Sequence, residues 1–512
     1  MNHRTRTGLR VGAVTASAAV LGSLAIAGPA QAAVPTNTEP LRDAVTVAGI
    51  TEHLDVFQAI ADANGGNRQA GTSGHDASVD YVEGLLEAAG YNTFRQPFSY
   101  QRTDFGDSAL QQVSPNAADY VLGVDYFPMD FSGEGDTGAA AVTVVDVNLT
   151  GDHATTSGCE ASDFTGFPAG NIALIQRGSC NFSVKADNAA AAGASGVIIF
   201  NQGNVVPGDD RLGLFGGTLD PPPRTIPVVS APYALGAEWV NTAGLVMRLN
   251  LEATIVDVDT ENLIAETPTG RTDRTVVVGG HLDSVGEGPG INDNGSGTAT
   301  ILETALQMAA LDIEPVNRVR FAFWSGEEDG LIGSSYYVSQ LSKSEIKGTA
   351  VNLNFDMVGS PNSVNFVYDG DGDALGVSGP NGSGVVEDVF TDYFDSQDIP
   401  WEPTDFDGRS DYFGFIEAGI PAGGLFTGAE GIKSAEQAAI FGGIAGEPYD
   451  PCYHAACDTT DNINDDTLDL MADAIAHSTL IFAETTSAVN GTAKGKAVGQ
   501  IDWAFKGNGA LR

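Results

Sequence analysis

Between residues 262 and 396 the chain alternates short apolar segments with longer amphipathic ones. The short segments have the composition of buried strands, and the longer ones have the periodicity of helices. Such alternation is typical of a parallel sheet with helices on both faces. We therefore expect a doubly wound, mostly parallel α/β domain. The expected strands are TVVVGG (275–280), VRFAFW (319–324) and AVNLNFDMVG (350–359), and the expected helices are TATILETALQMAAL (298–311) and VEDVFTDYFDS (386–396).

A helix and a strand are expected well before this region. The segment SVDYVEGLLEAAGY (78–91) places its apolar residues on one helical face, and Gly90 marks the C-terminal end of that helix. NTFRQPFSY (92–100) follows and has the pattern of a strand. This pair suits the edge of the α/β domain. Residues 33 to about 50 are expected to form an irregular leader.

A second, smaller domain is expected between the two parts of the first. The segments AAVTVVDV, NIALIQ and PPPRTIPVVS are strand-like, and SVKADNAAAAGASGVIIF combines an alanine-rich helix with a buried strand. We expect a β-rich α/β domain inserted at 131–250. The N-terminal part of the main domain then spans 33–130 and its larger part 251–487. Residues 488–512, rich in Gly, Ala and Lys, are expected to be a C-terminal extension.

The N-terminus has the pattern of a secretory signal peptide. Arg4, Arg6 and Arg10 precede an apolar run from Val11 to about Ala27, and the small-residue sequence AQA follows at 30–32. The run is too short and too alanine-rich for a membrane span. We expect residues 1–32 to be a signal peptide and the protein to be secreted and soluble, with no membrane partner.

The charge balance excludes nucleic acid as a partner. The chain carries 24 Lys and Arg against 67 Asp and Glu, for a formal net charge of -43, whereas phosphate binding needs a basic face. Solubility is the simplest reason for such acidity. Carboxylate-rich surfaces can also hold divalent cations. A monomer is expected.

The four cysteines fit an oxidising compartment. Cys159 and Cys180 are 21 positions apart, and Cys452 and Cys457 are five apart. Three pairings are possible, of which pairing within each region is the simplest. No two cysteines have the CxxC spacing, which disfavours a cysteine zinc site.

Histidine and carboxylate side chains follow the ends of the expected strands. In a doubly wound sheet, binding sites form beyond the carboxyl ends of the strands. Acids gathered there would repel one another unless a cation held them, and imidazole with carboxylate suits zinc. The residues so placed are His281, Asp293, Glu327, Glu328 and Asp356.

Each of these residues has a simpler reading when taken alone. His281 could be an ordinary hydrogen-bonded histidine, and Asp293 could cap the helix that follows. The Glu327–Glu328 pair could be a solvated turn, and His454 could be a surface residue of a small disulfide loop. Asp356 is harder to explain in this way, because it follows apolar residues in a buried strand and needs a partner there. Together these residues favour a metal site.

Six motifs occur in the order and spacing of a known family. The chain resembles the secreted bacterial two-zinc aminopeptidases of the aminopeptidase Y family over about 50–105 and 256–485. The motifs are HLDSV (281–285), INDNGSG (291–297), GEEDGLIGS (326–334), NFDMVGSP (354–361), GRSD (408–411) and CYHAAC (452–457).

The resemblance implies a site with two zinc ions. It implies that His281 and Asp356 hold one zinc and that Glu328 and His454 hold the other. Asp293 is then expected to bridge the two ions. Periodicity and composition indicate only an α/β fold and a metal.

The resemblance also implies roles for residues around the zinc ions. Glu327 is expected to be the general base and Tyr453 to donate a hydrogen bond to the oxyanion. Asp283 is expected to orient His281. Arg409 is expected near the terminal groups of the substrate.

The activity implied is removal of N-terminal residues from peptides and proteins, with large apolar residues such as leucine preferred. Carboxypeptidase or glutaminyl cyclase activity on the same scaffold is one alternative. Cyclase relatives generally lose part of the metal-ligand set, and all five expected ligands are present here. A non-catalytic extracellular binding protein is the other alternative, and its ligands would be substituted.

Two further features follow from the resemblance. Asp469 and Asp473 match the C-terminal half of a calcium site found in some relatives, whereas Ala44 and Val45 fall at its N-terminal positions. The segment IALIQRGSCNFSVKADNAAAAGASGVIIFN (172–201) resembles a protease-associated domain, and that match extends over about 135–245. Such domains are usually non-catalytic, and the domain could guide substrate or act only as a spacer.

Overall fold

The computed structural model describes residues 36–206 and 209–491. The expected signal peptide (1–32) lies outside these ranges, as do residues 492–512 of the expected C-terminal extension. Within the described ranges, the helices are all too short or too polar to cross a membrane.

The main domain is built on a sheet whose central strands run parallel. β12 (Arg271–His281) pairs in parallel with β13 (Asn317–Trp324) on one side and with β14 (Thr349–Phe355) on the other. β14 pairs in parallel with β17 (Ala422–Phe426). The flanking pairs are antiparallel, through β11 (Val246–Glu266) beyond β13 and β15 (Phe366–Tyr368) beyond β17. The expected mostly parallel, doubly wound α/β fold is therefore confirmed.

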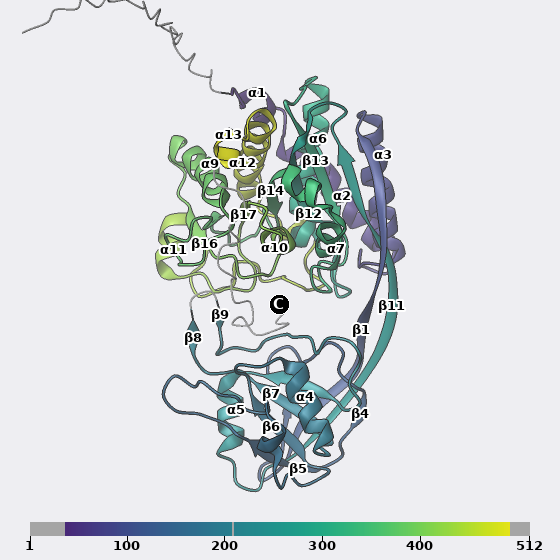
Figure 1. Ribbon diagram of the computed structural model, residues 1–512, viewed down its shortest axis with the longest axis vertical. Helices are drawn as coiled ribbons and strands as arrows, with labels where there is room; N and C mark the ends of the chain where they lie inside the picture. The colour runs from purple at the N-terminus through teal and green to yellow at the C-terminus, as the bar shows by residue number, and fades with distance from the viewer. Residues whose placement is uncertain (1–35, 207–208, 492–512) are drawn as a thin grey trace, which may run out of the picture. The chain divides into compact units, whose positions relative to one another are not determined.

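Helices cover both faces of this sheet because the central strands are apolar on both sides. On β13, Phe321 and Phe323 pack in one core and Ala322 and Trp324 in another, as the two-residue period of a strand requires. The first core is covered by α2 (Val47–Ala63), α3 (Ser73–Ala88), α6 (Gly297–Ala310), α9 (Ser383–Ser396) and α12 (Asp465–Glu484). The second is covered by α7 (Ile332–Gln340), α8 (Lys343–Gly348) and α10 (Tyr412–Glu417) (Figure 1).

The expected irregular leader at 33–50 is wrong at 39–42 and 47–50, which are helical. A short helix, α1 (Glu39–Arg42), and the start of α2 lie there. Thr46 caps α2 by accepting a hydrogen bond from the backbone N–H of Gly49. Ile50, Leu54 and Phe57 are spaced at four and three residues and are buried in the main core. This helical spacing begins with Ile50, the last residue of the expected leader, so residues 33–50 alone do not show it.

The inserted domain has its own parallel sheet. The strands β5 (Ala140–Val145), β6 (Ile172–Gln176), β7 (Gly196–Phe200) and β10 (Val228–Ala231) pair in that order, and β3 (Phe127–Pro128) adds antiparallel to β10. The helix α4 (Phe182–Ala191) packs on one face and α5 (Tyr233–Val240) on the other. The expected β-rich α/β insertion is confirmed. Cys159 and Cys180 form a disulfide within it.

Two long strands connect the sheets of the two domains. β1 (Asn92–Ser114) and β11 pair antiparallel from Asn92↔Glu266 to Ser114↔Val246, and Figure 1 shows them side by side. One end of β11 pairs with β13 and its other end with β5. The chain therefore leaves the main domain and returns to it through one two-stranded ribbon. The expected boundary at 250 falls inside β11.

The remaining elements are short. They are β2 (Ala118–Tyr120), β4 (Gly135–Asp136), η1 (Ala161–Phe164), β8 (Val205–Val206), β9 (Asp209–Asp210), η2 (Ile291–Ser296), β16 (Glu402–Thr404), α11 (Ala435–Phe441), η3 (Thr460–Asn462) and α13 (Ser487–Gly491).

Candidate metal centre

The candidate site lies at the carboxyl ends of the central parallel strands. His281 is the last residue of β12 and stands opposite Trp324, the last residue of β13. Glu327 and Glu328 follow three and four residues later, and Asp356 comes directly after β14. Parallel strands bring these side chains to one edge of the sheet, as expected from the sequence.

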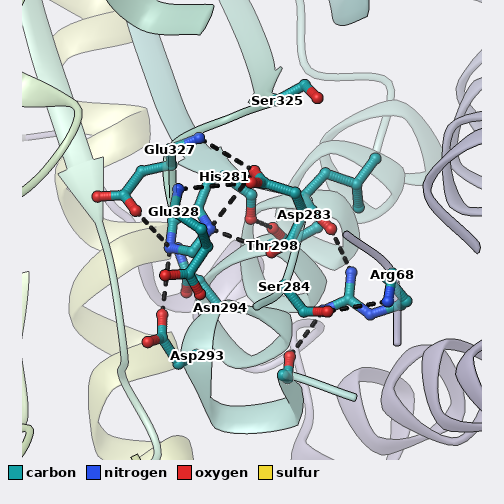
Figure 2. Close-up of polar contacts among 12 residues, drawn as sticks. Arg68, His281, Asp283, Ser284, Asp293, Asn294, Thr298, Ser325, Glu327 and Glu328 are labelled. Carbon is teal, nitrogen blue, oxygen red and sulfur yellow. Dashed lines mark hydrogen bonds and ion pairs between the residues drawn. The ribbon is translucent and has the colours of Figure 1, made fainter. Parts of the chain in front are cut away.

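Asp293 lies between two histidines. Its Oδ1 is 3.2 Å from His281 Nε2, and its Oδ2 is 3.1 Å from His454 Nε2. Each imidazole also faces one further carboxylate. His281 Nε2 is 3.2 Å from Asp356 Oδ1, and His454 Nε2 is 2.9 Å from Glu328 Oε2. Figure 2 shows the part of this cluster that contains His281, Asp293 and Glu328.

These distances suit two groups of metal ligands. Two donor atoms that share a tetrahedral zinc at about 2.0–2.1 Å lie about 3.3 Å from each other. The four nitrogen–oxygen distances are close to this separation. The carboxylates are buried, with 5–9% of their surface exposed, and buried carboxylates need cationic partners. The donor set therefore fits divalent zinc.

The ionisation of the cluster shows how strongly its charges interact. Burial and Asp356 raise the pKa of Glu327 well above its usual value. Burial acts to lower the pKa of His281, but Glu327 and Asp356 outweigh it and raise that pKa. For Asp293 burial is outweighed by hydrogen bonds from His281 and His454, which hold its pKa well below the usual value. The raised pKa values favour protons on Glu327 and His281, which reduce the negative charge of the cluster. A bound cation would balance that negative charge instead.

Asp283 lies on the side of His281 that faces away from Asp293. Its carboxylate is fully buried and lies 3.7 Å from His281 Nδ1, the nitrogen that faces away from Asp293. The backbone N–H groups of Glu327 and Glu328 point to the two oxygens of Asp283, each at 3.4 Å. Burial raises the pKa of Asp283 to about 8. One acid thus links the ends of β12 and β13.

Tyr453 and Arg409 come together on the open side of the cluster. Arg409 Nη2 donates to Tyr453 Oη at 3.2 Å, and Arg409 Nη1 donates to Glu430 at 2.8 Å. The Cys452–Cys457 disulfide closes the loop that carries Tyr453 and His454. Both expected disulfides are therefore present.

The same side chains line a cavity whose remaining wall is part apolar and part charged. Asp293, Glu327, Glu328, Asp356 and His454 form its polar end. The apolar part of the wall includes Leu331, Met357, Tyr368, Phe426 and Tyr449, and the charged part includes Asp405, Asp407, Arg409 and Glu430.

The simpler readings of single residues do not match their contacts. The N-cap of α6 is Ser296, and the Asp293 carboxylate contacts the two histidines instead of the helix amides. Glu327 and Glu328 are buried and do not form a solvated turn. His454 is directed at Asp293 and Glu328.

Several residues in contact with this site were not identified from the sequence. Ser410 donates to Asp356 Oδ2 at 2.5 Å. Asp458 accepts from the backbone N–H groups of Asn292 and Asp293 at 2.8 and 3.0 Å. Arg68 lies under the loop that follows His281 and contacts its backbone. In the sequence, Ser410 lies within the GRSD motif and Asp458 directly follows the CYHAAC motif. Nothing else in the sequence marks these residues as part of the site.

The expected calcium ligands lie elsewhere and have other partners. Asp469 and Asp473 are on α12. Asp473 Oδ2 accepts from Arg42 at 3.3 Å and from Tyr393 at 3.2 Å. Calcium needs six to eight oxygen ligands, and in residues 36–206 and 209–491 these two aspartates belong to no group of three potential metal-binding side chains. A guanidinium and one phenol hydroxyl face Asp473.

Comparison with known proteins identifies both domains. Residues 262–479 match the model of Peptidase family M28, and residues 137–239 match that of the PA domain. An aminopeptidase of Pseudomonas aeruginosa is 48% identical over 446 residues, which cover 86% of this chain and 82% of the relative. Leucine aminopeptidase 2 of Arthroderma otae is 37% identical over 450 residues, covering 88% and 86%.

Solved structures agree with these relatives. An aminopeptidase from Aneurinibacillus sp. strain AM-1 has a TM-score of 0.67 at 25% identity, covering 90% of this chain and 98% of that one. BSAP, a zinc aminopeptidase from Bacillus subtilis, has a TM-score of 0.56 at 26% identity, covering 88% and 97%. These similarities support aminopeptidase activity over the carboxypeptidase, cyclase and binding-protein alternatives. The chain therefore belongs to peptidase family M28, as a zinc metallo-aminopeptidase with an inserted PA domain.

Proposed function

We propose that this aminopeptidase is secreted, uses two zinc ions and removes large apolar residues such as leucine from peptide N-termini. The arrangement around Asp293 carries the proposal. Each of its carboxylate oxygens faces a different histidine, and each histidine faces one further carboxylate. One bridging acid between two such pairs is what a two-metal site needs.

The ligand assignment follows from these pairs. His281 and Asp356 would hold one zinc, Glu328 and His454 the other, and Asp293 both. Zinc supplies Lewis acidity, which polarises a peptide carbonyl and lowers the pKa of water.

Glu327 is the general base in this proposal. Its Oε2 is 3.9 Å from His281 Nε2, farther than either of the carboxylates paired with that imidazole. It is therefore close to the reacting centre, but it lies farther from His281 than the proposed ligands Asp293 and Asp356 do. Glu327 would accept a proton from the attacking water and return it to the leaving amine. Asp283 fixes the position of Glu327 through its backbone N–H.

Tyr453 is oriented to stabilise the oxyanion. A guanidinium can only donate hydrogen bonds, so Arg409 must use the Tyr453 oxygen as an acceptor. The phenol hydrogen is thereby left for the substrate oxygen, where negative charge develops. Glu430 anchors Arg409 at 2.8 Å.

The cavity supports a preference for large apolar residues. Its lining includes Leu331, Met357, Tyr368, Phe426 and Tyr449 beside charged residues such as Asp405 and Asp407. The apolar part of the lining would bind an apolar side chain through the hydrophobic effect. The acidic end of the cavity would favour the positive N-terminal amine. The similarity to a leucine aminopeptidase of Arthroderma otae agrees with this preference.

Secretion is supported by the chemistry of the cysteines. The described residues hold two disulfides and no free cysteine, which suits an oxidising compartment outside the cytoplasm. The arginine-led apolar run at the N-terminus has the pattern of a signal peptide.

The test combines metal content with turnover. The mature wild-type chain is expected to hold two zinc ions and to cleave leucine anilide, with activity lost on chelation and restored by zinc. The variant Glu327→Gln should keep both zinc ions and lose about 10²–10⁴ in kcat. Glu417→Gln, at an exposed glutamate of α10, is the matched control and should behave as wild type.

Other outcomes would contradict separate parts of the proposal. One zinc per fully active chain would refute the two-zinc site. Near-normal kcat in Glu327→Gln would refute the general base. Equal kcat/KM for alanine and leucine anilides would refute the preference for large residues.

A further inference from the structure

Arg68 is a buried arginine whose side chain contacts backbone carbonyls. It lies between α2 and α3 and has no exposed surface. Its guanidinium donates to the carbonyl oxygens of Leu282, of Pro289 at 3.0 Å and of Gly290 at 2.6 Å. The guanidinium carbon lies 5.0 Å from the centre of the Phe57 ring. Buried arginines usually pair with carboxylates, so this set of partners needs an explanation.

The three carbonyls belong to the two ends of one loop. Leu282 directly follows His281, and Gly290 comes three residues before Asp293. The planar guanidinium therefore ties the start of the loop to its end. His281 and Asp293 are the first ligand and the bridging ligand of the proposed site.

The loop has few side chains of its own to fix its shape. Residues 282–290 include three glycines and a proline. The segment around Arg68 supplies the missing contacts. The Arg68 backbone N–H donates to Ser284 Oγ at 2.8 Å, and Asn67 Nδ2 donates to the Gly286 carbonyl at 3.1 Å. Figure 2 shows Arg68 beside Ser284, on the far side of Asp283 from Glu327 and Glu328.

A second role for Arg68 must be distinguished from this one. Its positive charge is felt by Asp283, Asp458, Asp293 and Glu328, so it could act as a counter-charge. Two bound divalent ions would supply that charge in larger amount. A counter-charge needs only a cation, whereas a tie between both ends of the loop needs several donors in one plane.

We propose that Arg68 is a positioning residue that sets the spacing of His281 and Asp293 by joining both ends of the loop 282–290. This inference rests on the proposed zinc site. Arg68 touches neither substrate nor metal. Its loss is expected to weaken zinc binding through the loop and to lower kcat more than it raises KM.

The test uses Arg68→Lys and Arg68→Met in the full mature chain. Zinc affinity is measured by competition with a chromogenic chelator, and kcat and KM are measured on leucine anilide with saturating zinc. Lysine keeps the charge but has one nitrogen in place of three. We expect the zinc Kd to rise tenfold or more in both variants. Wild-type affinity in Arg68→Lys alone would mean that only charge matters, and it would overturn the inference.

A matched control separates positioning from general loss of stability. Arg320 is also a buried arginine of the main domain, with Glu266 and Tyr337 as partners. Arg320→Lys and Arg320→Met should lower the unfolding temperature without changing the zinc Kd. If the Arg68 and Arg320 variants lose zinc affinity equally, Arg68 has no special role and the inference fails.

A milder variant keeps the test decisive if Arg68 variants do not fold. Ser284→Ala removes the hydroxyl that accepts from the Arg68 backbone and donates to Gly288 at 3.0 Å. Its zinc Kd should rise about threefold or more, and an unchanged Kd would overturn the inference. A wild-type chain without zinc would refute the proposed site itself. Unchanged affinity in variants of a zinc-binding chain would refute only the role of Arg68.

Discussion

Lowering the pH should destabilise the chain through His75, which has no exposed surface. Its Nε2 lies 3.3 Å from the carbonyl oxygen of Glu261, and its Nδ1 has no hydrogen-bond partner within the described residues. Burial lowers the pKa of His75 from 6.5 to about 4, with smaller contributions in the same direction from Arg68 and Arg95 and an opposing one from Glu261. The imidazole is therefore neutral when the chain is folded at neutral pH.

The size of the effect follows from the two pKa values. Between pH 6.5 and 4 the unfolded chain binds a proton at this histidine and the folded chain does not. The free energy of unfolding must then fall as the pH falls. At about 1.4 kcal/mol per pKa unit, the loss is about 3 kcal/mol when complete and about 2 kcal/mol at pH 5. The full stability is present above pH 6.5.

The assay is urea unfolding at several pH values from 4.5 to 7.5, with disulfides intact and chelator present. Other groups titrate in this range, so the quantity of interest is the difference between wild type and His75→Gln. The wild type should lose about 2 kcal/mol more than the variant between pH 7.5 and pH 5. His153→Gln, at a half-buried histidine of the inserted domain, is the control and should follow the wild type. Parallel curves for wild type and His75→Gln would refute the reasoning.

Three further changes test other parts of the structure. Asp458→Asn removes the negative charge that accepts hydrogen bonds from the backbone N–H groups of Asn292 and Asp293. It should raise the zinc Kd about tenfold, because such charge-assisted bonds contribute about 1.5–3 kcal/mol. A wild-type Kd in chelator competition would count against this. Replacing Cys452 and Cys457 with serine should lower the free energy of unfolding in urea by about 2 kcal/mol. It should also lower kcat/KM on leucine anilide at least tenfold, since the loop carries a proposed zinc ligand, and unchanged turnover would contradict this prediction. Trp324→Ala removes a fully buried ring and should destabilise the chain by about 3–5 kcal/mol, and a loss below about 1 kcal/mol by urea unfolding would show that the core can collapse around the cavity.

The central sheet could be predicted because its strands are continuously apolar. The buried runs in β12, β13 and β14 stand out from their surroundings in any short window. Their ends were less clear. β12 begins at Arg271, four residues before the expected start, because exposed polar residues extend the strand beyond the apolar core. The helix α2 was missed because its apolar residues begin only at Val47, at the edge of a polar segment.

The site could be predicted as far as its ligands, because these are side chains at the ends of strands. The contacts that hold the loop in place could not be predicted in the same way. Arg68 and Leu282 are 214 positions apart, and the guanidinium binds backbone carbonyls. Every residue has a carbonyl, so no pattern of side chains marks the three that Arg68 contacts. Asp458 likewise binds backbone N–H groups of the loop before α6.

The ribbon of β1 and β11 makes the inserted domain exchangeable. Partners across an antiparallel ladder lie about 4.5–5.5 Å apart, so Ser114 and Val246 present the two chain ends of the insertion as close neighbours. A two-residue turn could connect the same two strands. The PA domain therefore stands where a plain hairpin would have its tip. A short turn, or another domain of similar end spacing, would fit the same two strand ends, so the insertion can be exchanged without a change in the strand order of the catalytic sheet.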